Sequence, residues 1–311
     1  MAIRALVVNG DDFGLTPGVN AGIVEAHVRG VLTSASLLAN APGTDEAILL
    51  ARRTPTLGVG CHLALVDADP VLRASELPTL APGGHFRPTW QAFIVDALAG
   101  RIEPNEIERE LTAQIQRLTT AGLTLTHLDT HKHVHAFPPV FKVVARLAQR
   151  FGIPTVRIPF EPRSLALVAS CFNRRGARRQ AIENLASAPW AWRDRRLLRH
   201  HQLTPAPVFL GRVLTGMFTA ADVSALLKQV AEGVSEWMTH PGYPDTALRS
   251  VRTRLRQERA AEVAILTDPA TIDIVRREGI VLVRHGDRAW SAARRPSRHE
   301  TSSARETIGN R

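Results

Sequence analysis

The residues of this chain best suited to chemistry lie in the stretch from Thr126 to His135. This stretch, THLDTHKHVH, holds four of the twelve histidines and one aspartate. Neutral imidazole binds metals and titrates near physiological pH, so the cluster predicts a metal or acid/base centre. A lone histidine is more often only a polar residue in a half-buried strand, and it is the clustering that favours chemistry here.

Three of these histidines, His131, His133 and His135, alternate along a segment that we predict to be an extended strand. Their side chains would then point to one face of the sheet. Neighbours on that face lie roughly 7 Å apart, so three of them seldom reach a single ion. We therefore expect one or two to bind metal and the rest to contact substrate or to support the ligands.

Two adjacent carboxylates, Asp11 and Asp12, follow an apolar run that is rich in valine. Adjacent side chains point apart in an extended backbone, so the two cannot share one role. One could bind a metal while the other acts as general base toward a water molecule. An Asx-turn that caps a helix is the alternative, and the pair alone leaves it open.

Two further histidines stand in other segments. His62 is a polar residue inside the apolar run from Gly58 to Leu63, and by itself it would more often be a hydrogen-bonded core histidine. His240 precedes Pro-Gly-Tyr and has little meaning in isolation. Every candidate segment nevertheless lies at or just beyond the end of a predicted strand, and this shared position favours one site.

Strand and helix patterns alternate along the chain. Strands are predicted near 5–9, 33–40, 58–65, 126–135, 155–160, 208–213, 235–239 and 280–284. Helices follow most of them, and residues 67–90 are expected to form a long loop over the site. Seven or eight strands alternating with helices predict an α/β fold, an irregular (β/α) barrel that forms a single domain over residues 1–290.

The net charge of +10 is concentrated in two segments. Residues 163–201 hold nine arginines against two acids and interleave them with leucine and tryptophan, which is typical of an interfacial amphipathic segment. We expect a basic helical insertion at 163–207 that contacts a membrane peripherally, with a solvated helix pair or a lid as the alternative. No recognised nucleic-acid module accompanies this charge, so nucleic acid is not expected as a partner. The arginine-rich tail at 291–311 is predicted to be disordered.

Two features bear on the cellular compartment. Cys61 and Cys171 are too few and too scattered for a disulfide framework. The chain starts without the pattern of a signal peptide, and we find no segment apolar enough to span a bilayer. We expect a cytoplasmic protein, peripheral at the inner face of the membrane if the basic insertion docks there.

Four motifs in order resemble those of the YdjC-like carbohydrate deacetylase family, which includes chitooligosaccharide deacetylases. They are VNGDDFG from Val8, GCHL from Gly60, THLDTHKHVH from Thr126 and MTHPGY from Met238. The resemblance runs from about residue 3 to residue 285, interrupted by the basic insertion. Gly10 stands where the family usually has alanine, a change between small residues that should not disturb the ligands.

The resemblance implies a role for each matching residue. The metal ligands would be Asp12, His62 and His131, with Asp11 as general base and His240 as general acid. His133 and His135 would be left to support the ligands or to contact substrate, and Arg157 and Tyr243 would be further substrate contacts. Two histidines and one carboxylate suit one divalent ion, with Zn²⁺ and Mg²⁺ the main candidates beside Fe²⁺ and Mn²⁺.

The implied activity is removal of an N-acetyl group from an amino-sugar glycan or glycolipid, with release of acetate. The RIPFEP segment from Arg157 and the basic insertion are similar to the hopanoid biosynthesis-associated branch, whose substrate would be an N-acetylglucosaminyl hopanoid. The alternatives are a chitooligosaccharide deacetylase of sugar catabolism, a non-haem iron oxygenase with the same triad, and a non-catalytic barrel that binds lipid or polyanion. A homodimer and an acetylated amino-sugar are the expected partners.

Overall fold

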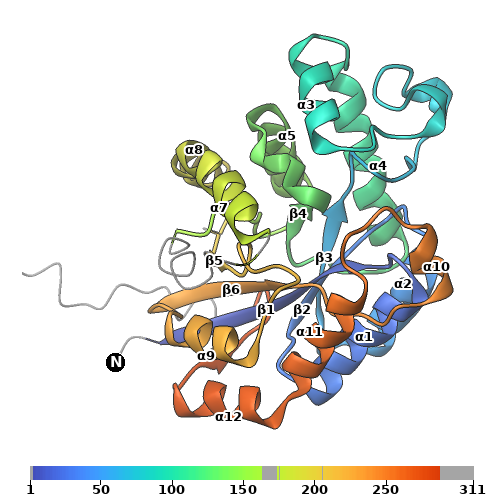
Figure 1. The fold of residues 1–311 in the computed structure, drawn as a ribbon. Helices are drawn as coiled ribbons and strands as arrows, with labels where there is room; N and C mark the ends of the chain where they lie inside the picture. The colour runs from blue at the N-terminus through green and yellow to red at the C-terminus, as the bar shows by residue number, and fades with distance from the viewer. Residues whose placement is uncertain (1–2, 163–173, 175, 205, 288–311) are drawn as a thin grey trace, which may run out of the picture.

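The computed structural model describes residues 3–162, 174, 176–204 and 206–287, which form a parallel sheet surrounded by helices (Figure 1). The sheet of these residues has seven strands in the order β4-β3-β2-β1-β6-β5, with β7 paired to β1. The strands are β1 (Arg4–Phe13), β2 (Ser34–Leu37), β3 (Gly58–Leu63), β4 (Leu128–Thr130), β5 (Val208–Leu210), β6 (Gly233–Thr239) and β7 (Val281–Leu282).

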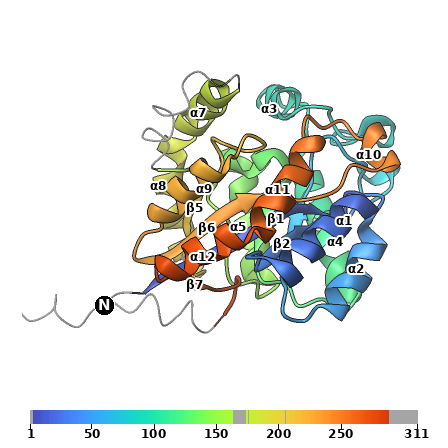
Figure 2. The same ribbon diagram turned by 60° about the horizontal axis from the view of Figure 1, so that its bottom comes forward.

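The helices cover the outside of this sheet (Figure 2). They are α1 (Pro17–Arg29), α2 (Thr44–Arg53), α3 (Trp90–Leu98), α4 (Pro104–Thr120), α5 (Pro138–Arg150), α7 (Ala177–Ala186), α8 (Ala188–His200), α9 (Ala220–Lys228), α10 (Thr246–Ser250), α11 (Gln257–Thr267) and α12 (Pro269–Arg277). Helix α1 begins at Pro17, and the Thr16 side chain caps it by accepting a hydrogen bond from Val19 N. Helix α4 also begins with a proline, Pro104.

The longest strand, β1, lies in the centre of the sheet. Its residues from Ala5 to Phe13 are buried, as expected for a valine-rich run covered on both faces. It pairs in parallel with β2 on one edge and along its length with β6 on the other. The ends of β1 and β6 therefore meet, with Gly10 opposite Thr239.

Isolated bridges continue the sheet beyond β4. Leu128 pairs with Val156, and Thr155 pairs with Thr204, only four residues before β5 at the other end of the strand order. The sheet thus curls back toward its own edge, which confirms the predicted α/β class and the irregular barrel. The strand expected at 155–160 is reduced to these bridges, because Ile158 and the two residues after it leave the ladder.

The prediction that one extended strand runs through all the histidines of 126–135 is wrong beyond Thr130, where β4 ends. Residues His131–Ala136 form a turn of 3-10 helix, η3, in which Lys132 and His133 take left-handed backbone angles with φ of 53°. The three histidines therefore do not share one face of a strand. Because of this turn, the three side chains contact different partners: His131 lies beside Asp12, His133 beside Phe209 and His135 beside the carbonyl of Arg157.

A buried polar stripe on α4 holds the loop that follows β3. Glu106 accepts hydrogen bonds from Thr79 N and Leu80 N, and Glu110 accepts them from Val71 N and Leu72 N. One turn further on, Gln114 bonds both the N–H and the carbonyl of Ala64. The long loop expected at 67–90 is thus anchored to α4, with its backbone polar groups satisfied by side chains.

The predicted basic insertion contains α7 and α8, which pack beside α5 at the edge of the molecule (Figure 1). Its residues 163–173 and the expected tail at 291–311 lie outside the described residues. Among the residues that the structure describes, no helix is both long enough and apolar enough to cross a membrane.

Candidate metal centre and active site

Three predicted ligands converge at the carboxyl ends of β1 and β3 and the start of η3. The Oδ1 atom of Asp12 lies 3.0 Å from Nδ1 of His131 and 3.5 Å from Nε2 of His62. One ligand atom from each residue lies within 4.8 Å of the other two. Two ligands that each lie 2.0–2.1 Å from a tetrahedral zinc ion are roughly 3.3 Å apart, so this donor set fits a divalent metal ion.

The backbone at the end of β1 separates the two aspartates. Asp12 has a φ of 69°, and the register against β2 shifts between Gly10 and Phe13. Aspartate is one of the few residues that tolerate this left-handed region. The side chain of Asp12 turns toward His131, while Asp11 turns toward Arg157. The predicted division of the pair into two environments is observed.

Helix α11 supplies Arg259 as a partner for Asp12, which the sequence pattern does not indicate. The buried Arg259 donates from Nη2 to Asp12 Oδ2 at 2.6 Å, so Oδ1 remains the atom that faces the two histidines. Burial raises the pKa of Asp12, but Arg259 and His131 outweigh it and hold that pKa well below its usual value. An arginine within a helical pattern carries no sequence signal for this role.

His62 is oriented by Asp129, which lies opposite it in the register of β3 and β4. Nδ1 of His62 lies 2.8 Å from Asp129 Oδ1, which leaves Nε2 to face Asp12. Such a carboxylate behind a ligating histidine fixes the tautomer and the ring orientation. Burial lowers the pKa of His62, but Asp129 and Asp12 outweigh it and raise that pKa to about 10.

Arg157 holds Asp11 in a buried ion cluster. Nη1 and Nη2 of Arg157 each donate to one oxygen of Asp11 at 2.7 Å. The same guanidinium contacts Asp129 at 2.6 Å and Glu236 of β6 at 2.8 Å. Burial and the neighbouring Asp129 carboxylate raise the pKa of Asp11, although Arg157 opposes them. A second set of possible ligands consists of Asp11, His62 and Asp129. Two of its three members are carboxylates already paired with Arg157, so it is the less suitable metal site.

Three of the four residues expected to contact substrate have protein partners at their polar atoms. Arg157 is 1% exposed, and its guanidinium contacts the carboxylates of Asp11 and Glu236. His135 is buried with Nε2 3.0 Å from the carbonyl of Arg157 and Nδ1 2.6 Å from Thr130 Oγ1, which assigns the proton to Nε2. The hydroxyl of Tyr243 donates a hydrogen bond to Glu25 on the outer helix α1.

His133 remains the substrate-contact candidate of that set. Its Nδ1 is buried and has no hydrogen-bond partner among the described residues. Its ring meets Phe209 edge to face, with centroids 5.8 Å apart. Burial and the charges of Arg212 and Arg157 hold the pKa of His133 well below its usual value, so its imidazole is neutral at pH 7.

His240 lies beyond the end of β6, which the pairing of β6 with β1 brings to the aspartates. Its backbone N–H donates to Glu262 of α11 at 2.5 Å, and its Nδ1 is buried without a hydrogen-bond partner among the described residues. Burial lowers the pKa of His240 to about 3, while the nearby Asp12 carboxylate acts in the opposite direction. Helix α11 thus contacts both a candidate ligand, through Arg259, and the candidate acid.

A second histidine pair lies beneath the site. The rings of His127 and His285 stack with centroids 4.0 Å apart, and Nε2 of His127 lies 3.0 Å from Ser36 Oγ. Ser36 in turn donates to Asp129. A Cβ at Gly60 would lie 2.5 Å from the ring of His127, so the glycine of the GCHL motif is required by this ring.

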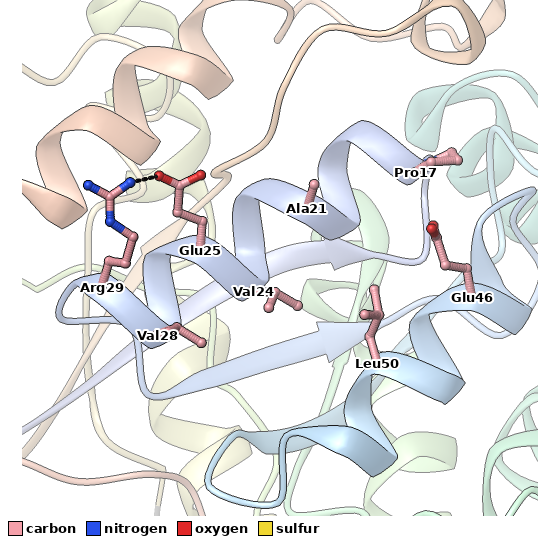
Figure 3. A pocket seen from close by; sticks show the side chains of 8 residues that line it. All are labelled: Pro17, Ala21, Val24, Glu25, Val28, Arg29, Glu46 and Leu50. Atoms are coloured by element: carbon pink, nitrogen blue, oxygen red, sulfur yellow. Dashed lines mark hydrogen bonds and ion pairs between the residues drawn. The ribbon is translucent and has the colours of Figure 1, made fainter.

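A groove of about 470 Å³ lies between α1 and α2 (Figure 3). Its lining includes Pro17, Val24, Glu25 and Leu50, and it contains none of the candidate ligands. It lies on the outer face of helices that cover the sheet, so the metal centre and this groove are separate features.

Known proteins resemble this chain over most of its length. The profile described as YdjC-like protein matches residues 5–277. The carbohydrate deacetylase of Brevibacillus brevis is 38% identical over 280 residues, which covers 89% of this chain and 97% of the relative. The carbohydrate deacetylase of Geobacillus stearothermophilus is 34% identical over 283 residues, with coverage of 91% and 97%. A solved structure of a candidate cellobiose-phosphate cleavage protein from Enterococcus faecalis V583 is 28% identical with a TM-score of 0.73, covering 91% of this chain and 98% of that one.

Proposed function

Because this chain belongs to the YdjC-like protein family, we propose that it is a metal-dependent carbohydrate deacetylase that removes an N-acetyl group from an amino sugar and releases acetate. The observation that carries the proposal is the convergence of Asp12, His62 and His131, with the buried Asp11 beside them in a separate environment. The relatives named carbohydrate deacetylase support the reaction class.

The proposed ligands are Asp12, His62 and His131, and the ion is a single divalent metal, with Zn²⁺ or Mg²⁺ the first candidates. When bound, such an ion polarises the amide carbonyl and lowers the pKa of water. Arg259 and Asp129 position two of the ligands from behind. Their contacts leave one oxygen of Asp12 and one nitrogen of His62 facing the site.

Asp11 is the proposed general base. It takes the proton of the water whose oxygen attacks the acetamide carbonyl carbon. Burial raises its pKa, which suits a base that works closer to neutral pH, and the two-pronged contact with Arg157 fixes both of its oxygens. We propose that Arg157 acts through Asp11 as a positioning residue.

His240 is the proposed general acid. Its pKa of about 3 makes it neutral in the free protein. Negative charge that develops during the attack on the carbonyl raises the pKa of a neighbouring imidazole. As its pKa rises, His240 takes up a proton from solvent and passes that proton to the amine nitrogen as the C–N bond breaks, giving acetate and a free amine. Asp11 returns the proton of the attacking water to solvent. His133, which is half-buried and whose Nδ1 has no hydrogen-bond partner among the described residues, is the proposed substrate contact.

We further propose that the acetylated sugar is lipid-linked, with an N-acetylglucosaminyl hopanoid as the first candidate. The enzyme would then be a cytoplasmic protein that contacts the inner face of the membrane through residues 163–201. The support is the arginine, leucine and tryptophan content of that insertion and the RIPFEP segment from Arg157. A chito-oligosaccharide of sugar catabolism is the alternative substrate.

The test is mass spectrometry for loss of one acetyl unit with added divalent metal. An N-acetylglucosaminyl hopanoid and a soluble chito-oligosaccharide would be compared, each with the wild type and with Asp12→Ala. Metal-dependent loss of acetyl by the wild type alone is expected, and the preferred substrate decides between the two candidates. Iron-dependent oxygen uptake would favour an oxygenase. Absence of turnover on every acetylated sugar, with ligand binding unchanged in Asp12→Ala, would favour a non-catalytic barrel.

A further inference from the structure

Two helical segments stand in the connections that leave the carboxyl ends of the strands around the metal centre. The chain passes from β3 through the loop at 64–89 into α3, and from the bridge at Val156 through 158–162 toward α7 and α8. Figure 2 shows α3 and α7 at the top of the molecule, away from α12, and in Figure 1 helix α5 stands between them. We call α3, α7 and α8 together the rim.

The rim exposes large apolar side chains. On α3, Val95 is 60% and Leu98 73% exposed, and on α7 Ile182 is 67% exposed. On α8, Trp192 is 63% exposed, and Trp190 and the α7 residue Leu185 are also exposed. Half of the twelve exposed large apolar side chains in the described residues therefore lie on the three rim helices. Such clustering indicates an interaction surface, whereas single exposed apolar residues are ordinary.

The same surface is basic. Helices α7 and α8 carry six arginines against Glu183 and Asp194, and Asp194 is buried. The guanidinium of Arg196 lies 4.7 Å from the ring centre of Trp192, and that of Arg193 lies 5.7 Å from the ring centre of Trp190. Arginine beside tryptophan on a helix is the composition of elements that lie in the interface of an anionic membrane.

Helices α7 and α8 of the rim are held by hydrogen bonds to the segment that follows Arg157. Asn184 of α7 bonds both the backbone N–H and the carbonyl of Glu161, at 2.8 and 2.9 Å. Ser187, between α7 and α8, donates to the carbonyl of Pro159 at 3.4 Å. Residues 158–162 follow Arg157 directly, so the position of α7 and α8 is fixed relative to the guanidinium that holds Asp11.

We propose that the rim docks on an anionic phospholipid surface and turns the strand ends that carry the candidate metal centre toward it. The exposed apolar side chains of α3, α7 and α8 insert among the lipid headgroups, and the arginines of α7 and α8 contact lipid phosphates. The docking rests on the proposed function in one respect, because a lipid-linked sugar substrate has its headgroup at this membrane surface.

The observations favour a lipid surface over a polyanion such as nucleic acid. Phosphate contacts by arginine would suffice for a nucleic acid, whereas exposed aliphatic side chains such as Leu98 and Ile182 gain nothing from a hydrated phosphate backbone. A membrane interface takes both kinds of side chain at once.

The test is co-sedimentation of the full chain with vesicles of phosphatidylcholine, with and without phosphatidylglycerol, at low and high salt. We expect binding that requires phosphatidylglycerol and weakens with salt. The double variant Ile182→Ser/Trp192→Ala should bind about tenfold more weakly, from the loss of two inserted side chains. Val28→Ser is the matched control, since Val28 is 69% exposed on α1 away from the rim, and it should bind as the wild type does.

Several outcomes would overturn the proposal: no binding of the wild type to anionic vesicles, equal binding to phosphatidylcholine alone, or equal effects of the rim and Val28 variants. Binding to duplex DNA with none to vesicles would assign the surface to polyanions instead. Turnover of a soluble chito-oligosaccharide, measured on the same proteins, separates this proposal from the deacetylase function. Vesicle binding without turnover of any acetylated sugar would contradict only the proposed function, and turnover without vesicle binding would contradict only the docking.

Discussion

Replacement of Asp129 by asparagine tests whether the buried carboxylate behind His62 supports the metal centre. Asp129 accepts from three partners: Nδ1 of His62 at 2.8 Å, Oγ of Ser36 at 2.9 Å and Nη1 of Arg157 at 2.6 Å. Asparagine has nearly the same shape, but only its single oxygen accepts, so its amide nitrogen must face one of these donors. The substitution therefore removes charge and one hydrogen bond without creating a cavity.

Two magnitudes follow from these contacts. Loss of a carboxylate behind a ligating histidine costs about 10- to 100-fold in metal affinity, or roughly 1.4–2.7 kcal/mol. Removal of one partner from a buried ion pair costs about 3–5 kcal/mol of folding stability. Because Arg157 keeps Asp11 and Glu236, we expect the free energy of unfolding to fall by about 3 kcal/mol, at the lower end of that range.

The assays are titration calorimetry with Zn²⁺ and urea denaturation of the metal-free protein. Asp45→Asn is the matched control, because Asp45 forms an exposed ion pair with Arg117 and should cost at most about 1 kcal/mol. Unchanged Zn²⁺ affinity in a folded Asp129→Asn protein would refute the reasoning, since it would mean that His62 is not a ligand oriented by Asp129.

Three further predictions concern the same cluster. Arg157→Lys should lower kcat by about 100-fold, because lysine cannot hold both oxygens of Asp11. The affinity for Zn²⁺ should stay within about threefold of the wild type. Equal losses of kcat and of Zn²⁺ affinity would contradict a positioning role. Gly60→Ala should lower the free energy of unfolding by about 1–3 kcal/mol in urea denaturation, since the added Cβ meets the ring of His127, and a neutral result would show that the ring moves freely. Metal affinity should rise with pH, by about tenfold per pH unit where binding displaces one proton. The reason is that the pKa of His62 is raised to about 10, so below that pH the metal competes with a proton for this side chain. A flat profile between pH 6 and 9 would exclude His62 as a ligand.

The positions of three candidate site residues could be predicted because they depend on a local rule. In a parallel α/β sheet the polar residues at the ends of apolar strands gather at one edge, and Asp12, His62 and His240 all follow this rule. That inference needed no knowledge of distant contacts. The separation of Asp11 from Asp12 was also predicted, but the alternation of an extended strand is not its cause, because Asp12 has a φ of 69°.

The histidine stretch shows where local rules fail. An alternating pattern suits an extended strand, but η3 begins directly after Thr130, and left-handed angles at Lys132 and His133 break the alternation. His135 consequently lies within hydrogen-bond distance of Thr130 and of the carbonyl of Arg157. Such non-glycine backbone angles have little signature in the sequence, because they are stabilised by the surrounding structure.

The α/β class and the strand ends near which the candidate site lies follow from the pattern of the sequence alone. The charged partners of the candidate ligands are set by the tertiary structure. Arg259 reaches Asp12 across 247 positions of the chain, and Arg157 reaches Asp11 across 146. Buried charges must be paired, but the partner is set by the packing of whole helices and strands against each other, which no local pattern encodes.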